Sequence, residues 1–346
     1  MTALVRRLQA GENPQLVRGT IVLVLGVVLI GLLMLALGIS PLRAYGSILE
    51  GAFGSRVHLA ETIAKTVPIA LIGLGTALTF RCGLWNIGGE GQLYFGAVAA
   101  LIVGVEYQGP AYIVLPLATA AGIVAGMFAG LIPAILRVRF HASEILVTLM
   151  LNFIALLLAS YMIAGPYKDL RVPATVPVGE AAQLATWTIG GLRVHAGLIW
   201  LLVLTAGMSF LLTRTSFGYR VGMVGANEDA ARNAGIDVSK LRVTAFLIAG
   251  GLGGLAGMIQ LSAVTRSLVD GFSPGFGYSA IVAALLGQLR PLPTLFASVG
   301  LSALLVGAQA MQRAEGIQMS LVDVIQGLLL LLLLGAGIVG QGLIRR

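Results

Sequence analysis

The chain has 346 residues, of which 58% are hydrophobic and only 10% are charged. A soluble globule of this length needs more polar residues to cover its surface, so the composition excludes an ordinary soluble domain and indicates that lipid surrounds most of the chain. The formal net charge is +8, but the basic residues stand singly between apolar runs, which disfavours nucleic-acid binding. The single cysteine, Cys82, excludes an intramolecular disulfide, and no Cys/His spacing is typical of a metal site.

Apolar segments of membrane-spanning length follow one another along the chain. An α-helix needs about 20 apolar residues to cross a bilayer. The first segment is longer than the core of a signal peptide, so we expect a retained helix behind a cytoplasmic leader, residues 1–18. The predicted fold class is an all-α polytopic membrane protein with one transmembrane domain, residues 1–346. Its ten predicted spans are 19–39, 60–80, 86–105, 111–136, 143–165, 196–213, 242–264, 275–289, 294–312 and 321–344.

The basic residues predict an orientation, because cytoplasmic loops of membrane proteins carry an excess of Lys and Arg. If the N-terminus is cytoplasmic, the loops on that side hold the larger share of the 22 basic residues, so we expect both termini inside. Two longer connections then fall on opposite sides. The connection 166–195 is extracytoplasmic and rich in proline, whereas 214–241 is cytoplasmic and charged; each is either a partner surface or a solvated connector.

Two regions of the sequence resemble each other, 61–105 and 243–289. Each contains a Gly-rich span, then a polar break with glycines, then an Ala-rich run. With ten spans the two copies enter the membrane from opposite sides, which is the inverted repeat of transporters whose substrate path lies at the repeat interface. We therefore expect a first repeat at 60–165, a second at 242–344, and broken or partly re-entrant helices after each polar break.

Polar residues inside the predicted spans are candidates for a substrate path, because a polar group in hydrocarbon needs a partner or water. Glu90 either caps a broken helix or contacts solute, and Glu144 is expected to cap the start of its own helix. Asn152, two helical turns deeper, bonds either another helix or the solute. Aromatic residues of the second region either stack on a flat heterocycle or form an interfacial belt. The predicted substrate-path residues are Asn86, Glu90, Gln92, Asn152, Phe153, Gln260, Phe276 and Tyr278.

The connection 214–241 predicts a short amphipathic helix from Asn227 to Ala234, ended by Gly235. None of the three lysines follows a glycine, so the chain has no phosphate-binding P-loop, and no soluble domain is large enough for a nucleotide site. No side chains stand at catalytic spacing. We therefore expect a chain that is not an enzyme and binds no cofactor or metal, with any ATP dependence supplied by another subunit.

Three motifs together resemble the permeases of ABC importers for branched-chain amino acids, ribose and nucleosides. Residues 84–92 read LWNIGGEGQ, and residues 144–155 end in MLNFIA, which is similar to the nucleoside and simple-sugar branch. Residues 217–235 lead from FGYRVGMVGAN into DAA and a glycine, which resembles an EAA-type coupling segment with Asp for Glu. The resemblance covers residues 60 to about 310.

The resemblance implies a type II importer permease with inverted-repeat halves in a bacterial inner membrane. Its implied partners are an ABC ATPase that binds ATP and Mg, a second homologous permease and an extracytoplasmic solute-binding protein. The expected solute is a nucleoside; the alternatives are a simple sugar or a branched-chain amino acid and, more remotely, a stand-alone secondary transporter or channel. The residues implied to couple to the ATPase are Asn227, Glu228, Asp229, Ala230, Ala231 and Gly235.

Overall fold

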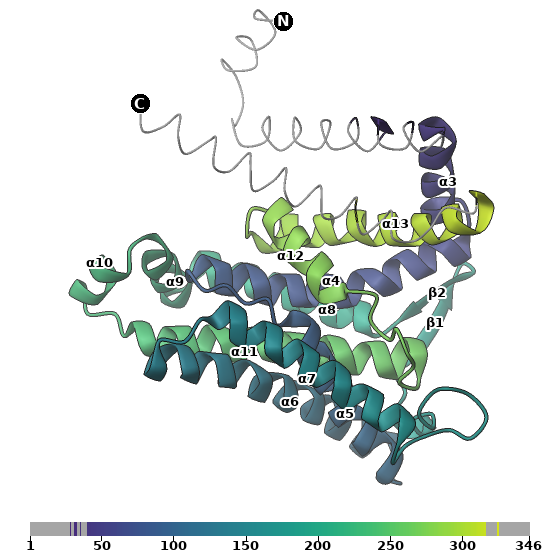
Figure 1. Cartoon of the computed structure of the whole chain (residues 1–346), viewed down its shortest axis with the longest axis horizontal. Helices are drawn as coiled ribbons and strands as arrows, with labels where there is room; N and C mark the ends of the chain where they lie inside the picture. The colour runs from purple at the N-terminus through teal and green to yellow at the C-terminus, as the bar shows by residue number, and fades with distance from the viewer. Residues whose placement is uncertain (1–27, 29–30, 33–34, 36–39, 316–323, 325–346) are drawn as a thin grey trace, which may run out of the picture. The chain divides into compact units, whose positions relative to one another are not determined.

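The structure is a computed structural model that describes residues 28, 31, 32, 35, 40–315 and 324 (Figure 1). The chain forms two compact units: Leu59–Ser302, and a second that combines Met1–His58 with Ala303–Arg346. In the second unit α3 (Pro41–Phe53) packs on the last part of α13 (Pro291–Glu315), with Gly51 against Ala310 and Gly307 against Ile48.

The Leu59–Ser302 unit is a helical bundle, entered through α4 (Arg56–Arg81) and left through the first part of α13. Its other helices are α5 (Gly89–Glu106), α6 (Ala111–Phe140), α7 (Glu144–Ala164), α8 (Gly197–Arg214), α9 (Ser216–Ala226), α10 (Glu228–Asn233), α11 (Val238–Ile259) with its π-helical end η2 (Gln260–Thr265), and α12 (Phe276–Leu286). A short 3-10 turn, η1 (Glu180–Ala182), precedes an antiparallel hairpin of β1 (Thr186–Ile189) and β2 (Leu192–His195).

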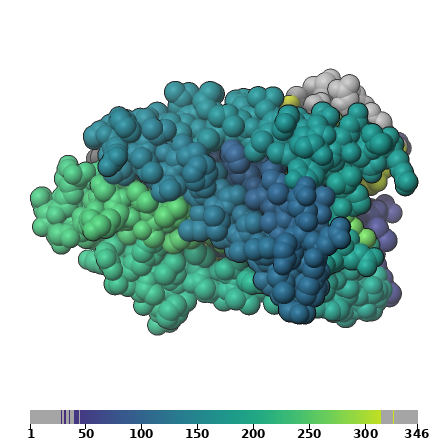
Figure 2. Space-filling view, turned by 90° about the horizontal axis from the view of Figure 1, so that it is seen from below, coloured from purple at the N-terminus to yellow at the C-terminus, as the bar shows by residue number. Residues whose placement is uncertain are grey.

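Six of the described helices are long and apolar enough to cross a membrane: α4, α6, α7, α8, α11 with η2, and α13. They differ in burial. α4 and α11 are mostly buried, whereas no more than a third of the spanning part of α6, α7 and α8 is buried, and α6 lies in the blue part of the face shown in Figure 2. A face of exposed Phe, Leu and Ile side chains is stable in contact with lipid or another apolar helix, so the chain is a multi-pass membrane protein in which α4 and α11 form the core of the Leu59–Ser302 unit.

Glycine allows α5, α6 and α11 to approach closely. In lipid the hydrophobic effect does not drive helices together, so packing depends on small residues at the interface. A Cβ atom at Gly126 would collide with the backbone of Gly250, and one at Gly96 with the backbone of Gly254. The glycines of residues 250–254 are therefore packing residues, and the backbones of α5 and α6 both lie against α11.

The β1–β2 hairpin and the α9–α10 segment lie at opposite ends of the Leu59–Ser302 unit (Figure 1). α4 begins at the hairpin end, where Glu61 and Arg193 line one cavity, and it finishes beside α9, where the Arg81 carbonyl lies against Gly225. α11 runs the other way: it begins in contact with α10 and ends in η2, which lines the hairpin cavity. These two helices begin the two similar sequence regions, and they are antiparallel.

Eight of the ten predicted spans coincide with observed helices, although α12 is only 11 residues long. The spans 19–39 and 321–344 and the leader 1–18 fall almost entirely outside the described residues. The amphipathic helix predicted at Asn227–Ala234 is α10, with Asn227 as its N-cap. The elements that were not predicted are α3, between the first two spans, η1 and the hairpin within 166–195, and α9 at the start of the connection 214–241.

Candidate functional site

The chain breaks between α4 and α5 inside the bundle. Gly83, at φ +73°, turns the backbone out of α4, and the next residues are not helical until α5 begins at Gly89. The buried Asn86 side chain organises this break, because its Oδ1 accepts hydrogen bonds from Gly88 N (3.0 Å) and from Gln92 Nε2 (3.3 Å). A non-helical backbone at this depth is stable only when such partners satisfy it.

Asn152 of α7 forms hydrogen bonds to the backbone of the same break. Its Oδ1 accepts from Gly91 N at 2.8 Å and its Nδ2 donates to the Ile87 carbonyl at 3.0 Å, so one amide satisfies a donor and an acceptor on either side of the start of α5. The side chain is buried, and Gly91 lies so close that a Cβ there would meet Asn152 Cα at 3.0 Å. Of the two interpretations open from the sequence, the structure shows the interhelical hydrogen bond.

Glu90 joins this break to a second one, the non-helical residues 266–275 between η2 and α12. Its buried carboxylate accepts a 2.6 Å hydrogen bond from Gly277 N, in the first turn of α12, and the Ser273 side chain is a further partner. The first turn of an α-helix has free N–H groups and a partial positive charge, so a carboxylate there is stabilising. Glu90 therefore caps a helix, as one interpretation of the sequence held, but the helix is α12 of the other similar region.

The backbones of α5 and α12 also come into close contact at Glu90 and Gly277. A Cβ at Gly277 would collide with Glu90, whose Cα would be 2.7 Å away. Tyr94, one turn along α5, accepts a hydrogen bond from Ser273 N at 3.2 Å, and its ring contacts that of Phe272 in a tilted arrangement with the centroids 5.8 Å apart. We call Asn86, Glu90, Gln92, Asn152 and Ser273 the break cluster; it places two helix N-termini next to each other inside the bundle.

The other predicted substrate-path residues lie in different settings. Phe276 is buried at the start of α12, and Gln260 is buried at the start of η2, where its Oε1 has no partner among the described residues. Tyr278 is 45% exposed, and Phe153 is 58% exposed on the outer side of α7. The structure thus brings together the buried polar residues of the prediction and leaves Phe153 on a different face of α7 from Asn152.

Glu144 does not cap its own helix, contrary to the expectation from sequence. Ser143 is the N-cap residue of α7, and no side chain caps that end. The Glu144 carboxylate instead forms an ion pair with Arg137 of α6 at 3.3 Å, and Trp85 N lies 3.5 Å from its Oε1. The reason is geometric: the α6–α7 turn brings the partly exposed Arg137 close enough to neutralise the buried carboxylate, which a cap would leave without a cationic partner. Glu144 therefore ties α6 and α7 to the broken segment.

At the α9–α10 end of the unit, Glu228 holds α10 on α11. Its two carboxylate oxygens accept from Arg242 at 3.1 and 2.6 Å, and Arg232 adds a 2.7 Å bond from within α10. The hydrogen bonds from Arg232 and Arg242 lower the pKa of Glu228. The pair with Arg232 lies four residues apart on the exposed surface of α10, where solvent screens it. The bidentate pair with Arg242, whose side chain is 14% exposed, is the stronger anchor.

Gly235 ends α10 in a left-handed turn. Its φ is +80°, its N–H bonds to the Arg232 carbonyl at 2.9 Å, and Ile236 N bonds to the Ala231 carbonyl at 3.0 Å, which is the Schellman arrangement. Ala231 is fully buried, so it packs α10 onto the protein. A partner at this end would therefore meet exposed neighbours such as Asp229 and Ala230 rather than Ala231.

Replacing Asn152 with Leu should destabilise the protein, because the Gly91 N–H and the Ile87 carbonyl lose their partner inside the bundle. Each buried group left unpaired costs about 1–3 kcal/mol. Thermal unfolding of the purified chain measures the effect. Phe153→Leu is the matched control, since it changes the adjacent, exposed side chain. Equal melting temperatures for the two variants would contradict the assigned hydrogen bonds.

Replacing Glu228 with Gln should loosen α10. We expect faster trypsin cleavage between residues 226 and 242 at neutral pH, with little change in Asp229→Asn, which removes the same charge from a residue that forms no ion pair within the described part of the chain.

The effect of Glu228 should also depend on pH. Because its folded-state pKa is lowered, its stabilisation is present above the unfolded value of about 4.3 and disappears as the pH falls through the lowered pKa. The gap in melting temperature between wild type and Glu228→Gln should therefore close in acid. A gap that persists at low pH would show that the substitution acts by another route.

The similarity to known proteins covers most of the chain. Residues 58–334 match the family model for the branched-chain amino acid transport system permease component. The guanosine ABC transporter permease protein NupP of Bacillus subtilis is 36% identical over 90% of both chains. The glucose ABC transporter permease protein TsgB13 of Haloferax volcanii is 35% identical over 88% of this chain and 83% of its own. NupQ, a second guanosine permease protein of Bacillus subtilis, is 26% identical over 70% of this chain and 79% of its own. The chain belongs to the branched-chain amino acid transport system permease family.

Proposed function

We propose that this chain is the membrane-spanning permease subunit of an ATP-driven importer for nucleosides. The observation that carries the proposal is the similarity to a guanosine permease protein, which is 36% identical over 90% of both chains. The MLNFIA stretch supports it, because it is similar to the corresponding stretch of nucleoside and simple-sugar permeases. The glucose permease is similar to nearly the same degree, so a simple sugar is the second candidate.

We propose that the broken helices line the solute path. In many transporters the solute site lies where discontinuous helices meet. The start of α5 and the start of α12 meet at Glu90 and Gly277, and Tyr278, one position on, is exposed. A nucleoside presents both hydrogen-bonding groups and a flat base, which suits polar main chain next to an aromatic face.

The proposed topology has ten spans in two inverted repeats, with both termini cytoplasmic. The antiparallel courses of α4 and α11 support the inversion, because these helices begin the two similar regions. The placement of the hairpin and of α9–α10 at opposite ends supports an extracytoplasmic loop at 166–195 and a cytoplasmic coupling segment at 214–241. The coupling segment would contact the ATPase through the exposed face of α10, held in position by Glu228.

The proposed assembly contains an ABC ATPase that binds ATP and Mg, a solute-binding protein and a second, different permease. The existence of two guanosine permease proteins in Bacillus subtilis that both match this chain, one far better than the other, supports a pair of unlike permeases. Alternating access would then arise when ATP-driven closure of the ATPase rocks two packed helical bodies around the solute path.

Uptake by the reconstituted complex tests this function. The tagged chain is purified from its own membrane with the proteins that remain bound to it, identified by mass spectrometry, and placed in liposomes with ATP in the lumen. We expect uptake of labelled guanosine that requires ATP and the binding protein and exceeds uptake of glucose or leucine by at least tenfold. Uptake of glucose without uptake of guanosine would show that the solute is a sugar and not a nucleoside. ATP-independent uptake by the chain alone would contradict the assignment as a subunit of an ATP-driven importer.

A further inference from the structure

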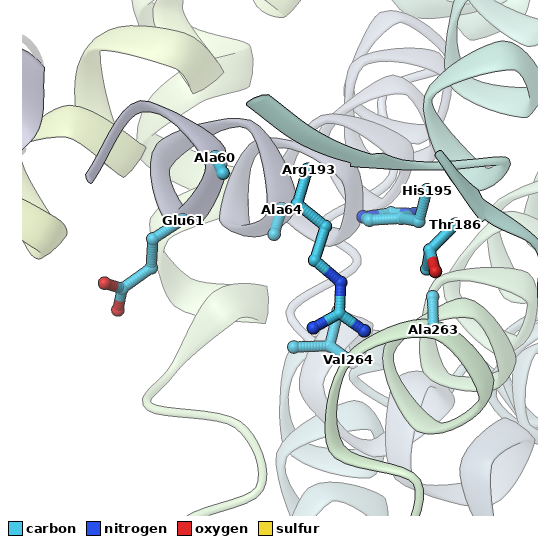
Figure 3. A pocket seen from close by; sticks show the side chains of 8 residues that line it. All are labelled: Ala60, Glu61, Ala64, Thr186, Arg193, His195, Ala263 and Val264. Carbon is cyan, nitrogen blue, oxygen red and sulfur yellow. The ribbon is translucent and has the colours of Figure 1, made fainter. Parts of the chain in front are cut away.

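A cavity of about 200 Å³ lies under the hairpin, outside the break cluster (Figure 3). The hairpin contributes Thr186, Arg193 and His195, α4 contributes Glu61, and η2 contributes Ala263 and Val264. A π-helical turn is rare and often occurs at functional sites, because it displaces side chains from the regular helical register. Here it forms the wall opposite the hairpin.

His195 is buried in this cavity without a hydrogen-bond partner. Its relative exposure is 5%, and neither ring nitrogen has a partner among the described residues. Burial lowers the pKa of the ring, so it is neutral at neutral pH and offers one N–H donor. Buried polar groups are almost always paired, so the two ring nitrogens of His195 indicate a polar occupant in the cavity.

Arg193 gives the cavity its charge. Its guanidinium points toward Val264, and the imidazole of His195 lies to its right in Figure 3, next to Thr186. Within the described part of the chain no carboxylate lies within ion-pair distance of Arg193. The nearest acidic lining residue, Glu61, turns its carboxylate away from Arg193 and pairs with Lys65 at 3.1 Å.

We propose that this cavity binds an oxyanion group, a phosphate or a carboxylate. The guanidinium of Arg193 supplies a planar fork of donors that matches such a group, and His195 and Thr186 supply an N–H and a hydroxyl from the same hairpin. The charge decides against a metal ion, because Arg193 repels cations and the described residues contain no group of three metal-ligating side chains. Arg193 is exposed, so the anion can enter from outside the bundle.

An occupied site would tie three elements together. The hairpin touches the anion through Arg193 and His195, while α4 and η2 form the remaining walls. Because η2 is the end of α11, and α11 begins at α10, the anion would brace one end of the helix whose other end holds the coupling segment. The anion is either a free ion or the headgroup of an anionic lipid, which share the same binding chemistry.

Binding of inorganic phosphate tests the site. The full chain, purified in mild detergent, is placed in nanodiscs of phosphatidylcholine and titrated with radiolabelled phosphate at constant ionic strength. We expect saturable binding by the wild type, weakened about tenfold or more in Arg193→Gln, which loses the charge-assisted bonds. Arg193→Lys should retain part of the affinity, because it keeps the charge without the fork.

Arg171→Gln is the matched control, since it removes an exposed arginine from the loop that carries the hairpin. If phosphate affinity falls equally in Arg171→Gln and Arg193→Gln, the effect comes from the loss of surface charge in general, and the proposal is overturned. Nanodiscs that contain phosphatidylglycerol distinguish the two sources. If the headgroup is the occupant, phosphate binding falls in these discs, and native mass spectrometry finds phosphatidylglycerol retained by the wild type but not by Arg193→Gln. Absence of both phosphate binding and Arg193-dependent lipid retention would overturn the site.

Discussion

The hydrogen bond from Gly277 to the Glu90 carboxylate is the contact on which the arrangement of the bundle depends. Two helices that start inside an apolar bundle each leave N–H groups without intrahelical partners, and apolar surroundings offer none. In this chain the start of α5 is satisfied by Asn152 and the start of α12 by Glu90. The carboxylate lies between two positive helix ends, which stabilises its own charge and reduces their repulsion.

α11 connects this cluster to both ends of the unit. It is anchored to α10 through Arg242, it lies against α5 where Gly253 faces the Gln92 side chain, and its π-helical end lines the hairpin cavity. Glycine contacts with α5 and α6 leave no room for a side chain between the backbones. A displacement of α10 therefore has to be carried along a rigid, closely packed helix, which is the kind of element that transmits a two-state movement.

The spans were predictable because hydropathy is a local property of the chain, and the end of α10 was predictable because only glycine readily adopts the φ of +80° found at Gly235. The hairpin also carries a local signal that was missed: Gly190 and Gly191, both at positive φ, stand between two runs of alternating residues. The Glu90–Gly277 contact joins residues 187 positions apart, and no local pattern specifies it. Asn152 and Phe153 show the same limit, since adjacent residues on a helix point about 100° apart and sequence alone did not decide which one faces inward.

Hydrogen–deuterium exchange of residues 272–278 tests the central contact most directly. This segment contains the N–H groups of Ser273, Phe276 and Gly277, which bond to Tyr94, Ser273 and Glu90 respectively. The account predicts slow exchange in the wild type, faster exchange in Glu90→Ala, and an intermediate rate in Glu90→Gln, which keeps an acceptor oxygen without the charge. Exchange in Glu90→Ala as slow as in the wild type would show that the two broken helices do not depend on Glu90 for their contact.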